Sequence, residues 1–462
     1  MPPDVETIGG GRAHGYHPLD MRGGSQMRLG DTANEGARGF GRPLDGVRVI
    51  ALEQMQALPF ATQLMGRMGA EIIKVEQVGR GDSGRTATPS MTRENGEKVG
   101  ATFVRNNLGK ESVAIDFQSE RGRQLVLDLS HKADIVCENL GPGKAERLGL
   151  DYETMSEEHP ELIYLSISGF GNDGLSPYEK WPAYASVAEA MSGIYEYARR
   201  PHQPPIINPV GGLGDTGTGL FGIIGVLAAL RHRDATGLGQ HVDVSMFDAM
   251  VSICDLAVNY WSMGQYREPD EEFDLPLILD SFLSARGWFI VQVVREHQFE
   301  RLANLVGHPE WVGDDRFATR QGWRDHFETD IRPAVEAWAA DKTNLEAAGA
   351  FAENGIAAAP CNSAPDVADD PHVALRNMLV EVERTDGVDQ PVLVAGNPIK
   401  MSRVAEGPEK FVPLMGEHTD SVLTSVLGLD DQAIDELIAA GVVSKVAGPA
   451  RPAATNTRSH ER

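Results

Sequence analysis

The sequence predicts an α/β protein in which a Rossmann-like large domain, built on a mainly parallel sheet, is joined to a smaller α+β domain. Strand-like apolar runs alternate with helical segments from residue 47 to residue 262, and such alternation is typical of parallel strands covered by helices on both faces. An acidic, loop-like stretch at 265–280 then precedes a second set of strands and helices. A chain of 462 residues is long enough for two or three domains.

Composition divides the chain into five segments. Residues 1–42 are glycine-rich and aperiodic, so we expect a flexible extension, and residues 447–462, rich in Pro, Ala, Arg and Thr, are expected to form a flexible tail. Between them we expect the large Rossmann-like domain at 43–265 and the small α+β domain at 270–390. A C-terminal segment at 391–446 is expected to return to the large domain.

The first ordered elements are expected directly after the extension. Residues 47–52 are an apolar run typical of a buried strand, Pro59 suits the first turn of a helix, Gly69 ends that helix, and residues 70–76 form a second strand. Strand, helix and strand in so short a stretch predict a right-handed βαβ unit. The connecting turn at 53–59 contains no glycine, so the unit lacks the phosphate-binding fingerprint of a dinucleotide site.

The alternation continues through the rest of the chain. In the large domain we expect strands at 112–117, 134–137, 162–168 and 241–246, with helices at 120–131, 142–148 and 220–230. In the small domain we expect a strand at 288–294 and amphipathic helices at 296–306 and 327–340. These segments extend the βαβ unit into a larger parallel sheet.

The most unusual stretch is glycine-rich, because five of the nine residues from 211 to 219 are glycine. Glycines let a backbone turn tightly and approach a ligand closely. An apolar helix that ends in basic residues is expected to follow, which places Asp215 at or just before a helix N-terminus. There Asp215 is either a nucleophile, held as an anion by backbone amides and the helix dipole, or only an N-cap, since aspartate is among the commonest N-caps.

The same stretch also fits a dinucleotide-binding pattern. Residues 212–217 match GxGxxG before a helix, and Asp243 lies in the next strand-like run. The preceding segment, 204–209, contains three prolines, and proline cannot donate to a strand ladder. A single GxGxxG is weak evidence, so we do not favour a dinucleotide site.

Composition argues against several classes of function. The net charge of −25 disfavours nucleic-acid and anionic-membrane partners. The three cysteines are scattered without metal-binding spacing, and no HExxH motif, EF-hand loop or GxSxG elbow occurs, so we expect no metal and no serine triad. No apolar run of membrane-spanning length and no secretory leader is recognised, which indicates a cytoplasmic protein.

Four polar residues follow expected strands, where open α/β sheets bind their ligands. They are Gln56, Asn139, Arg147 and Asp215. Each also has a purely structural explanation: Gln56 can cap a helix, and Asn139 and Arg147 flank a helix start and can simply hold its end. The residues alone leave these alternatives open.

A set of short motifs carries a resemblance to a known family. The clearest is Ala133-Asp-Ile-Val-Cys-Glu-Asn-Leu-Gly-Pro-Gly143 with Arg147-Leu-Gly149, and the others lie at 43–50, 69–76, 109–116, 168–171, 213–217, 236–240 and 415–419. In this order and spacing, the chain from about Pro43 to Val443 resembles the class III CoA-transferases. That family includes formyl-CoA:oxalate and carnitine CoA-transferases, and the α-methylacyl-CoA racemases are related to it.

The resemblance implies roles for individual residues. Asp215 matches the family's aspartate nucleophile, and Gln56 matches a glutamine beside the reacting thioester. The positions implied to contact CoA are Asn139, Leu140 and Arg147, and Lys110 and Arg85 are implied partners of its phosphates. Gly214 lies in the glycine stretch, whose backbone amides would stabilise an oxyanion.

The resemblance also implies a reaction and an assembly. The expected activity is transfer of CoA from an acyl-CoA thioester to a free carboxylic acid through an aspartyl anhydride and an aspartyl-CoA thioester, with CoA as substrate and no metal. The large domain would bind CoA. Each chain would form a ring of large and small domain, threaded by the other chain in an interlocked homodimer.

Three departures from the family pattern bear on the reaction. Ala185 stands where many members carry an acidic residue that the racemases use for proton transfer, which weakens the racemase alternative. Gln77 replaces an arginine that contacts CoA in some transferases. Residues 262–290 contain no polyglycine run like that of formyl-CoA transferases, so a larger and more apolar acyl group than formyl or oxalyl is expected. A non-catalytic CoA-binding protein remains a further alternative.

Overall fold

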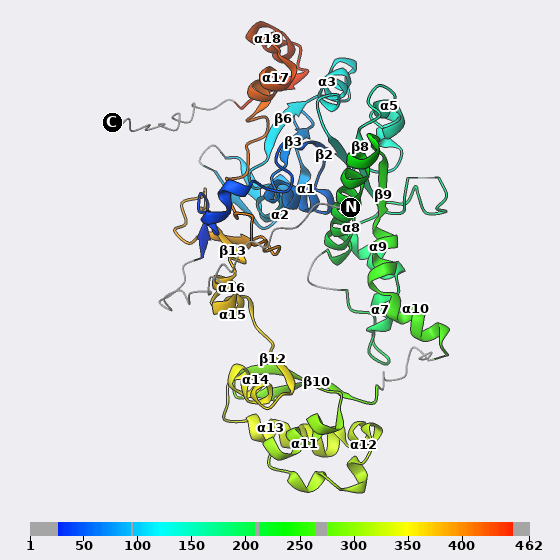
Figure 1. The fold of residues 1–462 in the computed structure, drawn as a ribbon, viewed down its shortest axis with the longest axis vertical. Coiled ribbons are helices and arrows are strands. Elements are labelled where there is room, and N and C mark those ends of the chain that lie inside the picture. The colour runs from blue at the N-terminus through cyan, green and yellow to red at the C-terminus, as the bar shows by residue number, and fades with distance from the viewer. Residues whose placement is uncertain (1–25, 94–95, 173, 208–211, 265–274, 447–462) are drawn as a thin grey trace, which may run out of the picture.

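The computed structural model describes residues 26–93, 96–172, 174–207, 212–264 and 275–446 (Figure 1). A large body contains the central sheet, and a smaller body of helices α11–α14 with strands β10–β12 lies below it in Figure 1. The mixed α/β architecture with a large, mainly parallel sheet confirms the predicted fold class.

The central sheet has seven strands, in the order β15-β6-β3-β2-β7-β8-β9. Six strands are parallel, and β15 alone pairs antiparallel, with β6. The strands are β2 (Arg48–Leu52), β3 (Glu71–Glu76), β6 (Glu111–Ile115), β7 (Ile135–Glu138), β8 (Ile163–Ser168), β9 (His241–Ser245) and β15 (Val443–Ser444). Successive residues of β2 and β7 are buried on both faces, as expected of a parallel sheet with helices on each side.

Helices cover the two faces of the sheet. On one face, α1 (Ala57–Arg67) and α8 (Leu213–Thr236) pack with alternate residues of β2, β7 and β8 into one apolar cluster. On the other face lie α3 (Glu120–Ser130), α5 (Tyr152–Ser156), α17 (Thr419–Leu427) and α18 (Asp431–Ala439). The C-terminal segment thus returns to the large domain, through α17, α18 and β15.

The chain order of the strands reverses beside β2. From β2 the chain proceeds outward through β3 and β6, and then crosses back to β7, β8 and β9 on the other side. The loops after β2 and β7 therefore diverge at the carboxyl edge of the sheet, which is where open α/β sheets form a ligand crevice.

Helix α8 is longer than predicted, because it begins at Leu213 rather than near residue 220. Gly214, Gly217 and Gly219 thus lie within the helix, and their role is close packing. A Cβ on Gly219 would stand 2.8 Å from a backbone oxygen of α1, and one on Gly214 would stand 3.0 Å from the backbone of α6. The glycine-rich stretch lets three helices meet, which corrects the prediction of a glycine loop.

The small domain has a three-stranded antiparallel sheet and a helical layer, where the sequence analysis expected one strand and two helices. The strands are β10 (Ile278–Ser284), β11 (Gly287–Val293) and β12 (Ala357–Pro360), and the helices are α11 (Glu296–Leu305), α12 (Arg320–Asp325), α13 (Arg332–Ala339) and α14 (Asn344–Glu353). Its core is aromatic, with Phe282, Phe289 and Trp323 buried. Alternate residues of β11 remain exposed, among them Trp288 and Ile290.

Two segment boundaries differ from prediction. Residues 26–42 are ordered, because β1 (Met27–Arg28) pairs with β13 (Leu379–Val382), which also pairs with β14 (Val392–Ala395). The predicted flexible extension is therefore wrong for 26–42, while residues 1–25 and 447–462 lie outside the described residues. Strand β13, predicted within the small domain, packs its apolar residues against the large domain.

The remaining elements connect these layers. They are β4 (Ser90–Thr92) paired with β5 (Lys98–Gly100), α2 (Ala101–Asn106), α4 (Lys144–Leu148), α6 (Ala185–Met191), α7 (Ile194–Tyr197), α9 (Met246–Ile253), α10 (Asp255–Ser262), α15 (Ala364–Ala368) and α16 (Pro371–Leu375). Within the described part of the chain, α8 is the one helix that is long and apolar enough to cross a membrane, and half of its apolar window is buried. That is weak evidence for a span, because core helices of soluble proteins share these properties.

Candidate functional site

Asp215 lies in the first turn of α8, at the carboxyl edge of the central sheet, because α8 runs back to the start of β9. The helix begins at the N-cap Gly212, whose φ of 102° is in the region that favours glycine. Asp215 is the third residue of the helix rather than its N-cap, and its carboxylate accepts no backbone N–H at the helix start within the described residues. The N-cap explanation of Asp215 is therefore not supported by the geometry.

Gln56 meets Asp215 across Gly212. Gln56 follows β2 at the N-cap position of α1, but it makes no side-chain capping bond, and it is buried. A Cβ placed on Gly212 would stand 2.2 Å from Gln56 Nε2 and 2.9 Å from Asp215 Oδ2. The structure thus brings together the two side chains that the sequence analysis placed at the reacting centre.

Arg105 is a third member of this group, and the sequence analysis missed it. It lies on α2, and its guanidinium donates a hydrogen bond to Gln56 Oε1. Although much of the side chain is exposed, burial lowers the Arg105 pKa, and the charge of Asp215 acts in the opposite direction. No motif pointed to Arg105, because its position depends on how α2 packs beside α1.

Glu189 provides the carboxylate that stabilises the start of α8. It is buried on α6, and its Oε1 accepts the backbone N–H of Gly214 at 2.9 Å, while its Oε2 accepts the Tyr195 hydroxyl. An anion at this place is favoured by the helix dipole. The prediction that Gly214 belongs to an oxyanion site is corrected, because its N–H is already bound.

Burial raises the pKa of the Asp215 carboxyl to about 6, with the nearby charge of Glu189 adding to the effect and that of Arg105 opposing it. A carboxyl with this pKa is mainly ionised at pH 7, and it is more basic than an ordinary aspartate. Shifts of this kind, produced by burial and specific charged partners, are found at functional sites. Asp215 has the environment expected of a nucleophile.

The loops after β2 and β7 are joined by Asn139. Its Oδ1 accepts the backbone N–H of Gln54 at 2.9 Å, and its Nδ2 donates to the Gln54 carbonyl at 3.0 Å. The next residue, Leu140, donates its backbone N–H to Glu138 Oε2 at 2.8 Å. Asn139 therefore holds the two walls of the switch-point crevice in place, which is a positioning role.

A cavity of about 110 Å³ lies in this crevice, and its lining includes Gln77, Arg80, Leu140 and Lys144. Three carboxylates also line it, and each is in an ion pair with a buried cation: Glu53, Glu76 and Asp82. Gln77 donates to Asp116, and within the described structure its Oε1 is buried without a hydrogen-bond partner. An unpaired acceptor and two cations suit a ligand with donor groups and phosphates, such as CoA. Arg147 is exposed nearby on α4, with Nη1 3.4 Å from the Pro142 carbonyl.

Lys110 is committed to a buried network. Its ammonium donates to Glu53 Oε1 at 2.7 Å, to Thr62 Oγ1 at 2.7 Å and to the Pro59 carbonyl at 3.0 Å. Burial lowers the Lys110 pKa to about 8, against the favourable charge of Glu53. With its three donors engaged, Lys110 does not fit the predicted phosphate contact.

Arg85 is likewise paired inside the protein. It is buried, it makes two hydrogen bonds to Glu76, at 2.6 and 2.8 Å, and it donates to the Pro413 carbonyl at 3.0 Å. The sequence analysis proposed Arg85 as a phosphate partner, and the structure assigns it instead to the loop after β3. The exposed Arg80 and the partly buried Lys144 are better placed at the crevice.

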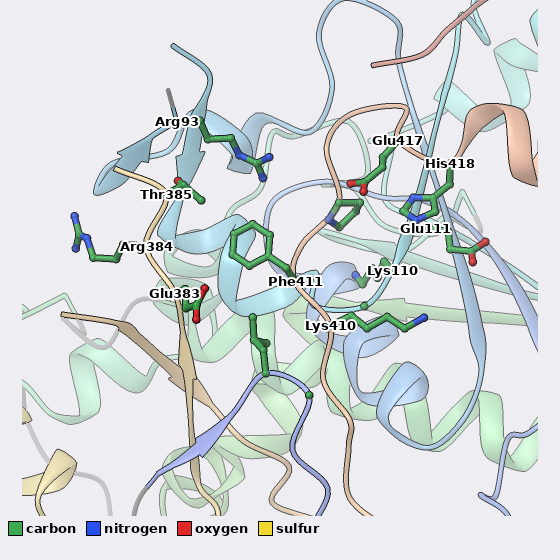
Figure 2. Close-up of a pocket in the computed structure, with 14 residues that line it drawn as sticks. Arg93, Lys110, Glu111, Glu383, Arg384, Thr385, Lys410, Phe411, Glu417 and His418 are labelled. Carbon is green, nitrogen blue, oxygen red and sulfur yellow. The ribbon is translucent and has the colours of Figure 1, made fainter. Parts of the chain in front are cut away.

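A wider cavity of about 560 Å³ lies at the amino end of β6, and Figure 2 shows the side chains that line it. The Arg93 guanidinium carbon lies 5.5 Å from the centre of the Phe411 ring, and Lys410, Glu111 and His418 are also at this surface. The cavity lies at the opposite edge of the sheet from Asp215. We therefore do not assign it to the reaction.

Comparison with known proteins identifies the family. Residues 44–419 match the family model described as CoA-transferase family III. The chain is 33% identical to a succinyl-CoA:mesaconate CoA-transferase of Haloarcula hispanica, over 82% of this chain and 95% of that protein. It is 32% identical to the succinyl-CoA–L-malate CoA-transferase beta subunit of Chloroflexus aurantiacus, over 86% and 96% of the two chains.

The fold agrees with these relatives. A crystal structure of a CAIB/BAIF family protein from Brucella suis superposes with a TM-score of 0.73 at 30% identity, covering 84% of this chain and all of that one. The matches extend over the large and small domains alike. The chain is therefore an enzyme with CoA-transferase activity, and it belongs to CoA-transferase family III.

Proposed function

We propose that this enzyme moves CoA from an acyl-CoA thioester to a free carboxylic acid, with Asp215 as the covalent carrier. The observation that carries the proposal is the ionisable Asp215 carboxylate, which stands beside Gln56 and Arg105 and is not used as a helix cap. A carboxylate nucleophile divides one difficult transfer into easier steps.

The first half of the reaction loads CoA onto Asp215. An Asp215 carboxylate oxygen attacks the thioester carbonyl carbon, the carbon–sulfur bond breaks, and an anhydride and CoA thiolate result. The thiolate then attacks the Asp215 carbonyl carbon of the anhydride. The carbon–oxygen bond breaks, the first acid leaves as its carboxylate, and CoA remains on Asp215 as a thioester.

The second half reverses these steps with another acid. The acceptor carboxylate attacks the aspartyl thioester and releases the thiolate, which attacks the acceptor carbon of the new anhydride and regenerates the Asp215 carboxylate. No step consumes a proton or an electron. The task of the protein is to orient the reactants and to exclude water, which would hydrolyse both intermediates.

Gln56 and the crevice residues have distinct parts in this scheme. The Gln56 amide, with Nε2 toward Gly212 and Oε1 toward Arg105, can donate to the carbonyl oxygen that becomes negative during attack on Asp215. Leu140 and Arg147, with Arg80 and Lys144, would contact CoA at the switch point. Asn139 would support them by holding the crevice loops.

The acid substrates are proposed to be short dicarboxylic acids. The relatives in Haloarcula hispanica and Chloroflexus aurantiacus are named for succinyl-CoA with mesaconate or L-malate. The absence of a glycine run from the sequence at 262–290 also favours an acyl group larger than formyl. Preferred turnover of formyl-CoA with oxalate would count against this assignment.

The active form is proposed to be an interlocked homodimer in the cytoplasm. Large apolar side chains are exposed on α8 (Leu220, Ile224), on α10 (Val258, Trp261) and on β11 (Trp288), which suits a large permanent interface. Interlocked rings cannot separate while folded. A folded monomer that appears on dilution in gel filtration would contradict this assembly.

Two alternatives make different predictions. A racemase needs a proton-transfer pair, and Ala185 at the start of α6 offers none. A non-catalytic CoA-binding protein would not need Asp215. Incubation with an acyl-CoA in deuterated water tests the first, because a racemase exchanges the α-proton. Transfer activity of wild type and Asp215→Ala tests the second, and equal rates in the two would refute the proposed function.

A further inference from the structure

A second cavity adjoins the reacting centre. It has a volume of about 390 Å³, and its lining includes Gln56, Arg105 and Thr216. Its apolar lining comes from α1, β14 and the residue that precedes β13: Phe60, Leu64, Met378, Leu393 and Val394. Among the described residues that line it, none is acidic, so an anion entering the cavity meets no repelling charge.

The two arginines at this cavity differ in their pairing. Arg67 forms an ion pair with Glu409 at 2.8 Å and donates to the carbonyls of Ala395 and Gly396 at 2.7 and 3.0 Å. Arg105 donates to the neutral Gln56 amide, and the carboxylate that acts on its charge is that of Asp215. Arg105 is thus in no ion pair within the described structure, and the charge that balances it, in part, is that of Asp215.

That balance is lost during the proposed reaction. Once Asp215 carries an acyl group or CoA, its side chain is neutral, and Arg105 faces Gln56 without a negative partner. The favourable interaction between the two opposite charges is then lost. A second carboxylate on the substrate would restore the balance, and it would find the planar guanidinium suited to two parallel hydrogen bonds.

We propose that Arg105 determines substrate specificity by binding the distal carboxylate of a dicarboxylic acid while the reacting carboxyl group faces Asp215. The inference rests on the proposed function and assigns a residue to the recognition of its dicarboxylic substrates. The Gln56 amide spans the distance between the two charged groups, since its Oε1 faces Arg105 and its Nε2 faces Gly212 beside Asp215. A short acid can therefore reach both, with its hydrocarbon part against the apolar walls.

The test compares two thioesters of four-carbon acids, succinyl-CoA and butyryl-CoA, which differ in the distal carboxylate. Loading of CoA onto Asp215 is followed by rapid quench and mass spectrometry of the intact chain, so no acceptor is needed. Wild type should load from succinyl-CoA with the higher second-order rate constant. In Arg105→Gln that value should fall roughly 10- to 100-fold, as expected for a lost charged hydrogen-bond partner. The rate constant for loading from butyryl-CoA should change by less than about threefold in the same variant.

Controls separate the possible outcomes. Arg121→Gln removes the same charge from the exposed surface of α3 and should leave the preference unchanged. Arg105→Lys should keep part of the preference, and it supplies the comparison if Arg105→Gln does not fold. An equal loss for both thioesters would reduce Arg105 to a residue that positions Gln56, and would overturn the inference.

The inference and the proposed function fail in different ways. If wild type loads equally well from both thioesters, Asp215 is the carrier but Arg105 does not select a carboxylate. If wild type loads from neither, the proposed covalent route with short acids is wrong, and the inference falls with it.

Discussion

The raised pKa of Asp215 makes a prediction about stability that is separate from catalysis. The carboxyl has a pKa of about 6 in the folded chain, compared with its usual 3.8, so the folded chain binds this proton more tightly than the unfolded chain does. Above pH 6 the folded carboxylate is ionised at a cost, and a difference of about 2 pKa units corresponds to about 3 kcal/mol. Asp215→Asn keeps the shape without the charge, and should be more stable than wild type by about this amount at pH 8.

The direction of this stability difference, and the pH range in which it changes, both follow from the raised pKa of Asp215. As the pH falls from 6 toward 3.8, the folded wild type gains its proton before the unfolded chain does, so wild type recovers stability relative to Asp215→Asn. The difference should therefore be full above pH 6, narrow below it, and vanish near pH 4.

Urea unfolding at one fixed protein concentration, at several pH values between 5 and 8, measures this difference. The exposed Asp389→Asn serves as the matched control and should show no such pH dependence. If Asp215→Asn proves less stable than wild type at pH 8, or if its gain in stability does not vary with pH, the pKa of Asp215 is not raised by burial as described above.

Further predictions concern pH dependence and packing. Transfer activity, read as kcat/KM, should rise with pH through a limb near pH 6 as Asp215 ionises. Arg105→Gln removes a cation and should move this rise in kcat/KM to higher pH, whereas Glu189→Gln removes a like charge and should move it to lower pH. A rise that stays at the same pH in both variants would contradict these effects on the Asp215 pKa. Gly219→Ala places a methyl group 2.8 Å from a backbone oxygen of α1 and should cost about 1–3 kcal/mol in the free energy of unfolding. Gly349→Ala in α14 meets nothing within 4 Å and should instead stabilise by up to about 1 kcal/mol.

The sequence was sufficient for the features that depend on local pattern. Alternating strands and helices predicted the parallel sheet, and a parallel sheet places the loops after its strands at one edge. Gln56 and Asp215 could therefore be expected near one another, although 158 positions separate them, and the structure brings them together at Gly212. In the segment expected to form the small domain, the predicted strand at 288–294 corresponds to β11 and the predicted helix at 296–306 corresponds to α11.

Features that depend on tertiary pairing could not be predicted. The sequence analysis predicted that Lys110 and Arg85 bind phosphates. In the structure, Lys110 forms an ion pair with Glu53 and Arg85 forms one with Glu76. Nothing in the local sequence shows which cation meets a buried acid and which remains at a crevice.

The start of α8 is another feature that the local sequence could not predict. The sequence analysis weighed Asp215 as a cap because it lies near the start of α8, whereas the anion at that start comes from Glu189 on another helix. Strand β1 was missed for a related reason, since a two-residue strand has no periodicity of its own and is defined by its partner β13.

The central claim is that Asp215 carries CoA covalently. Wild type and Asp215→Asn would each be incubated with succinyl-CoA in the absence of an acceptor, treated with hydroxylamine, digested and examined by mass spectrometry. The account predicts a hydroxamate at Asp215 in wild type, none in Asp215→Asn, and a fall of several orders of magnitude in the transfer rate of that variant. An unmodified Asp215 in wild type, together with transfer by Asp215→Asn at close to the wild-type rate, would contradict it.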